Sequence, residues 1–219
     1  MIRFDNVSFG YSDSLVLKDI SLDIPDNKFI GILGPNGGGK STFLKLSLGL
    51  IKPSKGRIER SNGKISYVAQ TTSLSDGSFP ANVEEIVSLG LPMCPFFLHR
   101  KKRKETIKRT LEEFNLYSLR KRLVNELSGG QLQRVKVAKA LIKDPDFIVL
   151  DEPDAGLDEE AHNNLLSLVE DLHKKGKGIL FVSHHPEDLR QADIIYFVEG
   201  GTIVPYEEEL KRGHHHVDL

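Results

Sequence analysis

Cysteine is almost absent from this chain, which has 219 residues and a single cysteine, Cys94. One cysteine excludes an internal disulfide, which fits a reducing compartment. Long apolar runs are missing too, because none approaches the roughly 18 residues that a membrane-spanning helix needs. The first residues, MIRFDNVSF, lack the apolar centre of a secretory signal. We therefore expect a soluble, cytosolic protein whose membrane role, if it has one, comes through a partner.

An excess of either charge is also missing. The 30 lysine and arginine residues are balanced by 31 acidic residues, for a formal net charge of −1. Without a global basic field, electrostatics do not indicate nucleic acid as a partner. What is present is an ordinary globular composition, with 39% hydrophobic residues, which permits a sizeable core. The length predicts one large domain, or one domain with a subdomain.

Short apolar runs alternate with amphipathic segments along the chain. FIGIL, FIVLD and GILFV are typical of buried strands, and IIYFVEGGTIVPY predicts a terminal hairpin. Strand signals lie on both sides of a mostly helical stretch, from about residue 80 to residue 141. This order predicts an α/β fold with a mainly parallel sheet and a helical insertion. The tail GHHHVDL, residues 213–219, is expected to be mobile.

Four glycines surround one lysine in GPNGGGKST, directly after FIGIL. The segment matches the phosphate-binding pattern G-x-x-x-x-G-K-[ST], in which backbone N–H groups and a helix start face an anion. Lys40 is predicted to neutralise the β- and γ-phosphates, Ser41 to ligate Mg²⁺, and Thr42 to contact the α-phosphate. The predicted loop comprises Gly34, Pro35, Asn36, Gly37, Gly38, Gly39, Lys40, Ser41 and Thr42. A glycine-rich turn without a ligand is the alternative; the spacing of a dinucleotide site is absent.

Two acidic residues end another apolar run, because FIVLDE places Asp151 and Glu152 at the carboxyl end of a predicted strand. Asp151 is predicted to hold Mg²⁺ through water, and Glu152 to polarise the attacking water. Both can reach one site if the backbone turns at the strand's end. An acidic strand end before a proline, here Pro153, is also a common start of a loop. The motif indicates a catalytic site because the chain also contains the predicted phosphate loop.

The segment LSGGQLQR predicts a helix start, with Ser128 as the N-cap and Gln131 completing a capping box. Gly129 and Gly130 in a first helical turn cost about 1 kcal/mol each relative to alanine. That cost indicates that their backbone N–H groups must approach a ligand closely. The chain therefore contains a second predicted anion-binding helix start.

These motifs, in this order, resemble those of the ATP-binding cassette (ABC) ATPases, whose signature is LSGGQ, over nearly the whole chain. The resemblance implies one ABC ATPase domain, residues 1–219, with a P-loop NTPase core, an antiparallel β subdomain and a helical subdomain at about residues 80–141. It implies ATP and Mg²⁺ as cofactors. It also implies a head-to-tail dimer, in which each ATP lies between one subunit's phosphate loop and the other's signature residues, Ser128, Gly129, Gly130 and Gln131.

The resemblance assigns roles to single residues as well. Tyr11 resembles the aromatic residue that stacks on adenine, and Gln70 resembles the glutamine that senses the γ-phosphate and metal. Asp158, in AGLD, resembles the aspartate of the loop that crosses between subunits, and His184, in FVSHH, resembles the switch histidine. The departures are Gly38, where alanine or serine is commoner, and AGLD in place of SALD. The predicted catalytic residues are Glu152, His184 and Gln70, and the predicted metal ligands are Ser41, Gln70 and Asp151.

Plainer interpretations of these residues stay open. Tyr11 can be a half-buried aromatic at a strand end, and Gln70 can cap a loop. His184 and its neighbour His185 can bind a metal, or nothing.

SDGSFPANVEEIVSLG and DEPDAGLD resemble segments of cassettes that serve manganese, zinc or iron uptake. The resemblance implies the ATPase of a transition-metal importer, zinc or manganese first, located peripherally at the inner face of the cell membrane. Its partners would be integral-membrane subunits and an extracytoplasmic substrate-binding protein. The histidines of GHHHVDL suit Zn²⁺, but they are equally a solvated tail or added residues. An ABC ATPase of a non-metal transporter and a non-transport ABC switch protein remain alternatives.

Overall fold

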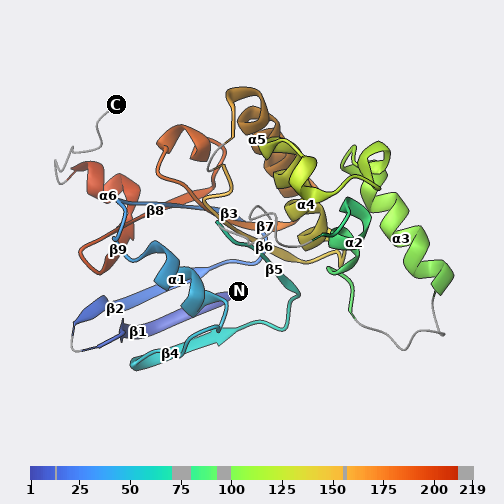
Figure 1. Cartoon of the computed structure of the whole chain (residues 1–219). Helices are drawn as coiled ribbons and strands as arrows, with labels where there is room; N and C mark the ends of the chain where they lie inside the picture. The colour runs from blue at the N-terminus through green and yellow to red at the C-terminus, as the bar shows by residue number, and fades with distance from the viewer. Residues whose placement is uncertain (13, 71–79, 93–99, 155–156, 212–219) are drawn as a thin grey trace. The chain divides into compact units, whose positions relative to one another are not determined.

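The computed structural model describes residues 1–12, 14–70, 80–92, 100–154 and 157–211 (Figure 1). The predicted tail, residues 213–219, lies outside the described residues. The chain divides into two compact units. The first consists of Met1–Ile65, Asp146–Glu152 and Val169–Leu219, and the second consists of Ser66–Pro145 and Pro153–Leu168. Strand β5 (Ile65–Val68) and helix α5 (Glu159–Lys174) each contain a boundary between the units.

An antiparallel sheet of three strands forms one layer of the first unit. Its strands, in the order β2-β1-β4, are β1 (Ile2–Gly10), β2 (Leu15–Ile24) and β4 (Lys55–Arg60). Ile2, Phe4 and Val7 of β1 are buried, and the ring of Phe4 stacks on Phe43 of helix α1 (Lys40–Ser47), with 4.9 Å between centroids. This sheet confirms the antiparallel β subdomain.

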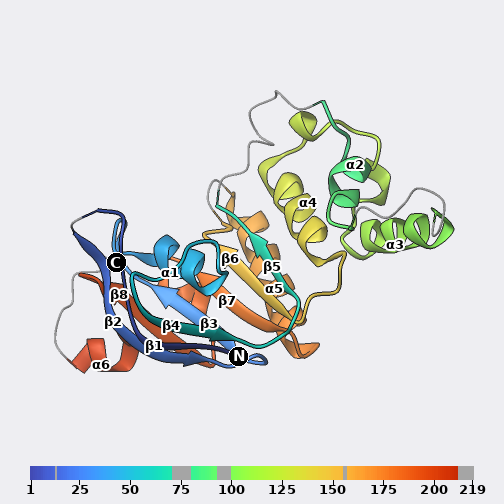
Figure 2. The ribbon, with the colours of Figure 1, turned by 90° about the horizontal axis from the view of Figure 1, so that it is seen from below.

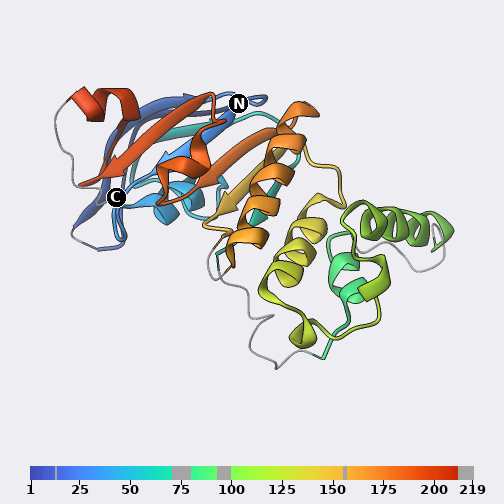
Figure 3. The ribbon, with the colours of Figure 1, turned by 90° about the horizontal axis from the view of Figure 1, so that it is seen from above.

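The second sheet of this unit contains the predicted buried strands. Its strands here run in the order β6-β7-β3-β8-β9 (Figure 3), where β3, β6, β7 and β8 are parallel and β9 is antiparallel to β8. Every residue of β3, β6 and β7 is buried, as expected for strands covered on both faces. The mainly parallel sheet and the terminal hairpin are therefore confirmed. The bounds are β3 (Phe29–Leu33), β6 (Phe147–Asp151), β7 (Gly178–Val182), β8 (Ile194–Glu199) and β9 (Thr202–Pro205).

Three neighbouring strands of this sheet end at one edge. Ile32 of β3 and Asp151 of β6 both pair with Val182 of β7. The segments that follow the three strands therefore leave the sheet side by side, at the carboxyl edge where ligands bind in open α/β sheets.

The amino end of β3 is held by Asp193, which precedes β8. The Phe29 N–H donates to Asp193 Oδ2 at 2.8 Å, and Lys28 Nζ donates to Oδ1 at 3.1 Å. The backbone hydrogen bond from Phe29, supported by Lys28, lowers the pKa of Asp193 below its ordinary value of 3.8. The carboxylate therefore stays charged, and its hydrogen bonds connect the start of β8 to the start of β3.

The second unit is mainly helical. It contains α2 (Val83–Ser88), α3 (Arg100–Glu113), α4 (Gly129–Leu141) and the start of α5, and α2 contacts both α3 and α4 (Figure 2). Asn82 caps α2 in a capping box with Glu85. Within the described ranges, we find no helix with both the length and the apolar character of a membrane span.

Candidate functional site

The predicted phosphate loop begins where β3 ends. Gly34 has a φ of 147°, and a Cβ at this position would collide with the carbonyl oxygen of Val198. Only glycine therefore allows this backbone conformation at the end of β3. Gly39, with a φ of 107°, is the N-cap of α1 and has no side chain that could cap the helix. The first N–H groups of α1 therefore have no side-chain acceptor at the cap, which fits a loop that binds phosphate oxygens.

Lys40, the first residue of α1, is only 5% exposed. Its Nζ donates to the carbonyl oxygens of Gly34, at 2.9 Å, and Pro35, at 3.2 Å, and lies 3.3 Å from Glu152 Oε1. A buried ammonium needs such partners, because an unpaired charge in the interior is costly. The structure therefore joins the loop lysine to the predicted catalytic base within one unit.

The two acidic residues lie where β6 ends. Asp151 is 5% exposed, and Glu152 has a φ of 43° while its N–H donates to the carbonyl oxygen of Val182 at 3.1 Å. A left-handed glutamate is uncommon and strains the backbone by about 1 kcal/mol or more. This is the turn at the strand's end that the sequence analysis required.

The oxygen donors predicted for Mg²⁺ are chemically suitable. Ser41 supplies a hydroxyl beside the loop lysine, and Asp151 supplies a carboxylate at the end of β6. Magnesium prefers such hard oxygen ligands and few of them from protein, because it keeps several waters. The residues that are present therefore fit the ion.

His184 and Tyr11 both lie just beyond strand ends in the first unit. His184 follows β7 and is exposed, and its ring centroid lies 4.0 Å from that of His185. Tyr11 follows β1 and is 63% exposed, with its ring at right angles to that of Phe9. The exposure of Tyr11 argues against the half-buried alternative and suits a stacking residue, a role that stays a prediction.

The remaining predicted residues belong to the second unit. Ser128 Oγ accepts from the Gln131 N–H at 3.3 Å, and the Ser128 N–H donates to Gln131 Oε1 at 3.2 Å, which confirms the capping box. Gln70 lies just beyond β5 and is exposed. Gly129 and Gly130 form the first turn of α4.

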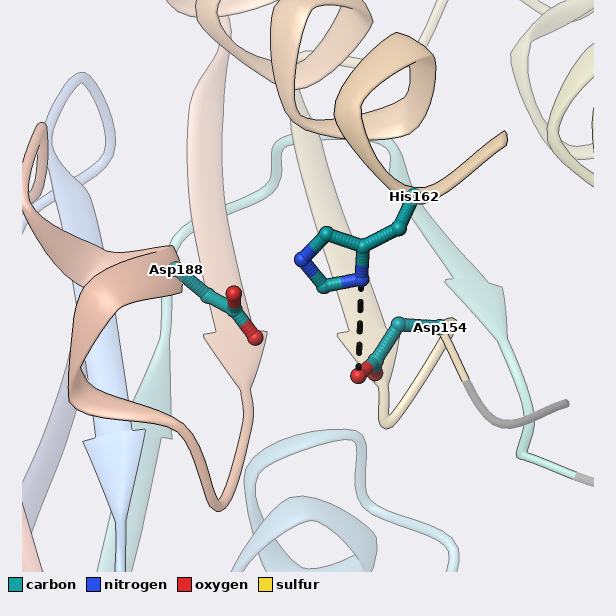
Figure 4. Close-up of side chains that lie close together, drawn as sticks. All are labelled: Asp154, His162 and Asp188. Atoms are coloured by element: carbon teal, nitrogen blue, oxygen red, sulfur yellow. Dashed lines mark ion pairs between the residues drawn. The ribbon is translucent and has the colours of Figure 1, made fainter. Parts of the chain in front are cut away.

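Asp158 has a structural contact that the sequence analysis did not assign. Its Oδ1 accepts from the Ala161 N–H at 2.8 Å, so Asp158 caps the start of α5. Nearby in the same unit, Asp154 Oδ2 lies 3.9 Å from His162 Nδ1 (Figure 4). Ser128, Gly130 and Asp158 line one cavity of about 360 Å³, so the second unit brings the signature and this aspartate together.

Gly130 also has a packing reason to be glycine. A Cβ at Gly130 would lie 2.6 Å from the Cβ of Ala161, closer than two carbon atoms can approach. Helix α4 therefore contacts α5 closely only because Gly130 has no side chain. The approach of a ligand, predicted from the sequence, is therefore not the sole reason for glycine at this position, because helix packing requires it too.

A pair of substitutions separates these two reasons. We expect Gly130→Ala to lower the free energy of unfolding by about 1–3 kcal/mol through overpacking, and Ala161→Gly in the same chain to restore most of it. Urea denaturation measures the stability, and ATP turnover of the double variant measures the ligand requirement. If Ala161→Gly restores no stability, the contact with Ala161 is not the cause. If stability returns while turnover does not, the glycine also serves the ligand.

Comparison with known proteins places these features in context. Residues 17–155 match the family profile described as ABC transporter. The chain is 38% identical over 201 residues to the manganese transport system ATP-binding protein MntB of Bacillus subtilis, covering 88% of this chain and 79% of that protein. It is 35% identical over 188 residues to the zinc import ATP-binding protein ZnuC of Hydrogenovibrio crunogenus, covering 84% and 72%. A dimeric ATP-binding cassette in a post-hydrolysis state, bound to ADP and Pi, has a TM-score of 0.78 at 26% identity, covering 93% of this chain and 96% of that chain.

Proposed function

Because the chain belongs to the ABC transporter family as an ATP-binding, ATPase subunit, we propose that it hydrolyses ATP in a head-to-tail homodimer to drive import of a transition-metal ion, manganese or zinc first. The main support for ATP hydrolysis is that Lys40 Nζ lies 3.3 Å from Glu152 Oε1, next to the loop that precedes α1. The metal cargo is supported by two relatives, one from a manganese transport system and one from a zinc import system.

Lys40 binds the β- and γ-phosphates in this proposal. Its ammonium contacts two loop carbonyls and Glu152, and phosphate oxygens offer a stronger anionic partner in the same place. Transfer of Lys40 from Glu152 to the nucleotide leaves the carboxylate of Glu152 able to accept a proton from the attacking water. Loop binding and activation of the base are thereby coupled through one lysine.

Three further groups complete the proposed half-site. Tyr11 stacks on adenine, Gln70 senses the γ-phosphate, and His184 contacts the γ-phosphate from the end of β7. Ser41, Gln70 and, through water, Asp151 would hold Mg²⁺, which would offset the charge that develops on the phosphates. Thr42 contacts the α-phosphate.

The second half-site belongs to the other subunit. There Ser128 and Gln131 cap the start of α4, and the N–H groups of Gly129 and Gly130, which take no part in the capping box, face the γ-phosphate. Asp158 contributes from the loop before α5. Support for the pairing comes from a solved relative that is dimeric and bound to ADP and Pi.

We further propose that the chain is one ABC ATPase domain, residues 1–219, with residues 80–141 as its helical subdomain. It acts at the inner face of the cell membrane, bound to integral-membrane subunits, and receives cargo through an extracytoplasmic binding protein. No nucleic acid takes part.

Identification of the membrane subunit that copurifies with this chain tests the proposal first. The assembled transporter is then reconstituted in vesicles that are supplied with ATP, and uptake of Mn²⁺, Zn²⁺, Fe²⁺ and representative organic solutes is measured. We expect ATP-dependent uptake of Mn²⁺ or Zn²⁺. Uptake of an organic solute without any metal response would reject the metal cargo, and absence of a membrane subunit would favour a switch protein.

A further inference from the structure

The segment that carries His184 is anchored by buried polar contacts that no assigned role explains. Ser183 follows the last residue of β7, is fully buried, and its N–H donates to the carbonyl oxygen of Ile32 in β3 at 3.1 Å. The backbone on the amino side of His184 is therefore attached to the central sheet.

The side chain of Ser183 bridges to the other side of His184. Its Oγ donates to Asp188 Oδ2 at 2.6 Å and accepts from the His185 N–H at 2.9 Å. The Asp188 N–H in turn donates to the carbonyl oxygen of His185 at 3.2 Å. These three bonds hold the backbone on both sides of His184, while the imidazole of His184 stays exposed.

Asp188 is itself held in place by its neighbours. It is 7% exposed, lies in the short helix Pro186–Leu189, and precedes the fully buried Leu189. Leu189 packs against Gly31 of β3, where a Cβ would lie 2.7 Å from Leu189 Cδ1. Asp188, whose side chain is drawn in Figure 4, is therefore a fixed acceptor rather than a mobile surface carboxylate.

Burying a hydroxyl and a carboxylate costs free energy unless hydrogen bonds offset the loss of water, as the bonds of Ser183 and Asp188 do. An apolar pair could fill the same space, but it could not bond the His185 N–H and so could not set the backbone on both sides of His184. We infer that Ser183 and Asp188 are positioning residues, which hold the His184 backbone so that the exposed imidazole presents itself at the carboxyl edge of the sheet. The inference rests on the proposed role of His184.

A double-mutant cycle tests this. We expect Ser183→Ala to lower the kcat for ATP about tenfold, the low end of what one buried hydrogen bond to a charged group contributes, with ATP affinity unchanged. Ser183→Thr, which keeps the hydroxyl, and Asp188→Asn, which keeps an acceptor oxygen, should each retain more turnover than Ser183→Ala and Asp188→Ala. Ser47→Ala is the matched control, because Ser47 is a fully buried serine that donates to the Phe43 carbonyl outside this ring of bonds.

The decisive measurement adds Ser183→Ala to His184→Ala, with single-turnover phosphate release as the readout and circular dichroism melting to verify folding. If Ser183 acts through His184, its removal changes nothing in the His184→Ala background. An equal tenfold loss in both backgrounds would overturn the positioning role while leaving the role of His184 intact. Unchanged turnover in His184→Ala alone would instead overturn the proposed role of His184, and the inference with it.

Discussion

Glu152→Gln should nearly abolish ATP turnover and leave an ATP-bound dimer that does not come apart. Loss of a general base lowers the rate by about 10²–10⁴-fold, because glutamine cannot accept the proton of the attacking water. The substitution also removes the negative partner of the buried Lys40 ammonium, 3.3 Å away. The glutamine oxygen can still accept from Lys40, but without a negative charge it competes less with phosphate, so we expect the affinity for ATP to rise rather than fall.

Phosphate release and size-exclusion chromatography with and without ATP measure the two effects. Glu199→Gln is the control, because Glu199 is an exposed glutamate at the end of β8, and it should behave as the wild type. An unchanged rate in Glu152→Gln would show that Glu152 is not the base. A large loss of rate together with weaker ATP binding would contradict the competition between Glu152 and phosphate for Lys40.

Mixing two inactive variants should restore ATP turnover. Ser128→Arg places a long cation at the start of α4 and blocks the signature half-site, while Lys40→Ala disables the phosphate loop. In a head-to-tail dimer of one copy of each, one composite site combines the intact loop of the first with the intact signature of the second. Random mixing then leaves about a quarter of the wild-type number of sites intact.

This complementation needs exchange of subunits, so the variants are mixed without ATP before ATP is added. Ser128→Ala serves as the control for loss of the helix cap, which costs only about 1 kcal/mol, and should lose less turnover than Ser128→Arg. ATP binding to monomeric Ser128→Arg should stay close to that of the wild type. Were the site completed within a single chain, no ratio of the two variants would recover activity.

The sequence predicts the strand-end motifs well because each has a local cause. FIGIL, FIVLD and GILFV form buried parallel strands. Gly34, Gly37 and Gly39 adopt backbone angles that other residues rarely adopt. The capping box of Ser128 and Gln131 is likewise a short-range pattern, and the structure contains it. Local chemistry of this kind can be read without knowing the fold.

Features that depend on distant parts of the chain could not be predicted. The contact between Gly130 and Ala161 joins residues of two helices, and nothing near Gly130 in the sequence announces it. The bond of Ser183 to Asp188 could not be predicted either, because it depends on how the segment after β7 folds. Helix α6 (Tyr206–Lys211), after the terminal hairpin, was not predicted, because its six residues carry no helical period long enough to recognise.

The shared end of β3, β6 and β7 limits how this protein can change during evolution. Ile32, Val182 and Asp151 pair across one line, so inserting a single residue into β7 would turn Ser183 and His184 to opposite faces and shift them by about 3.3 Å. Asn62 and Gly63, in the turn between β4 and β5, are exposed and carry no such restriction. Insertions should therefore accumulate in this turn. In homologous cassettes, the number of residues between each strand end and the residue that corresponds to Lys40, Glu152 or His184 should stay constant.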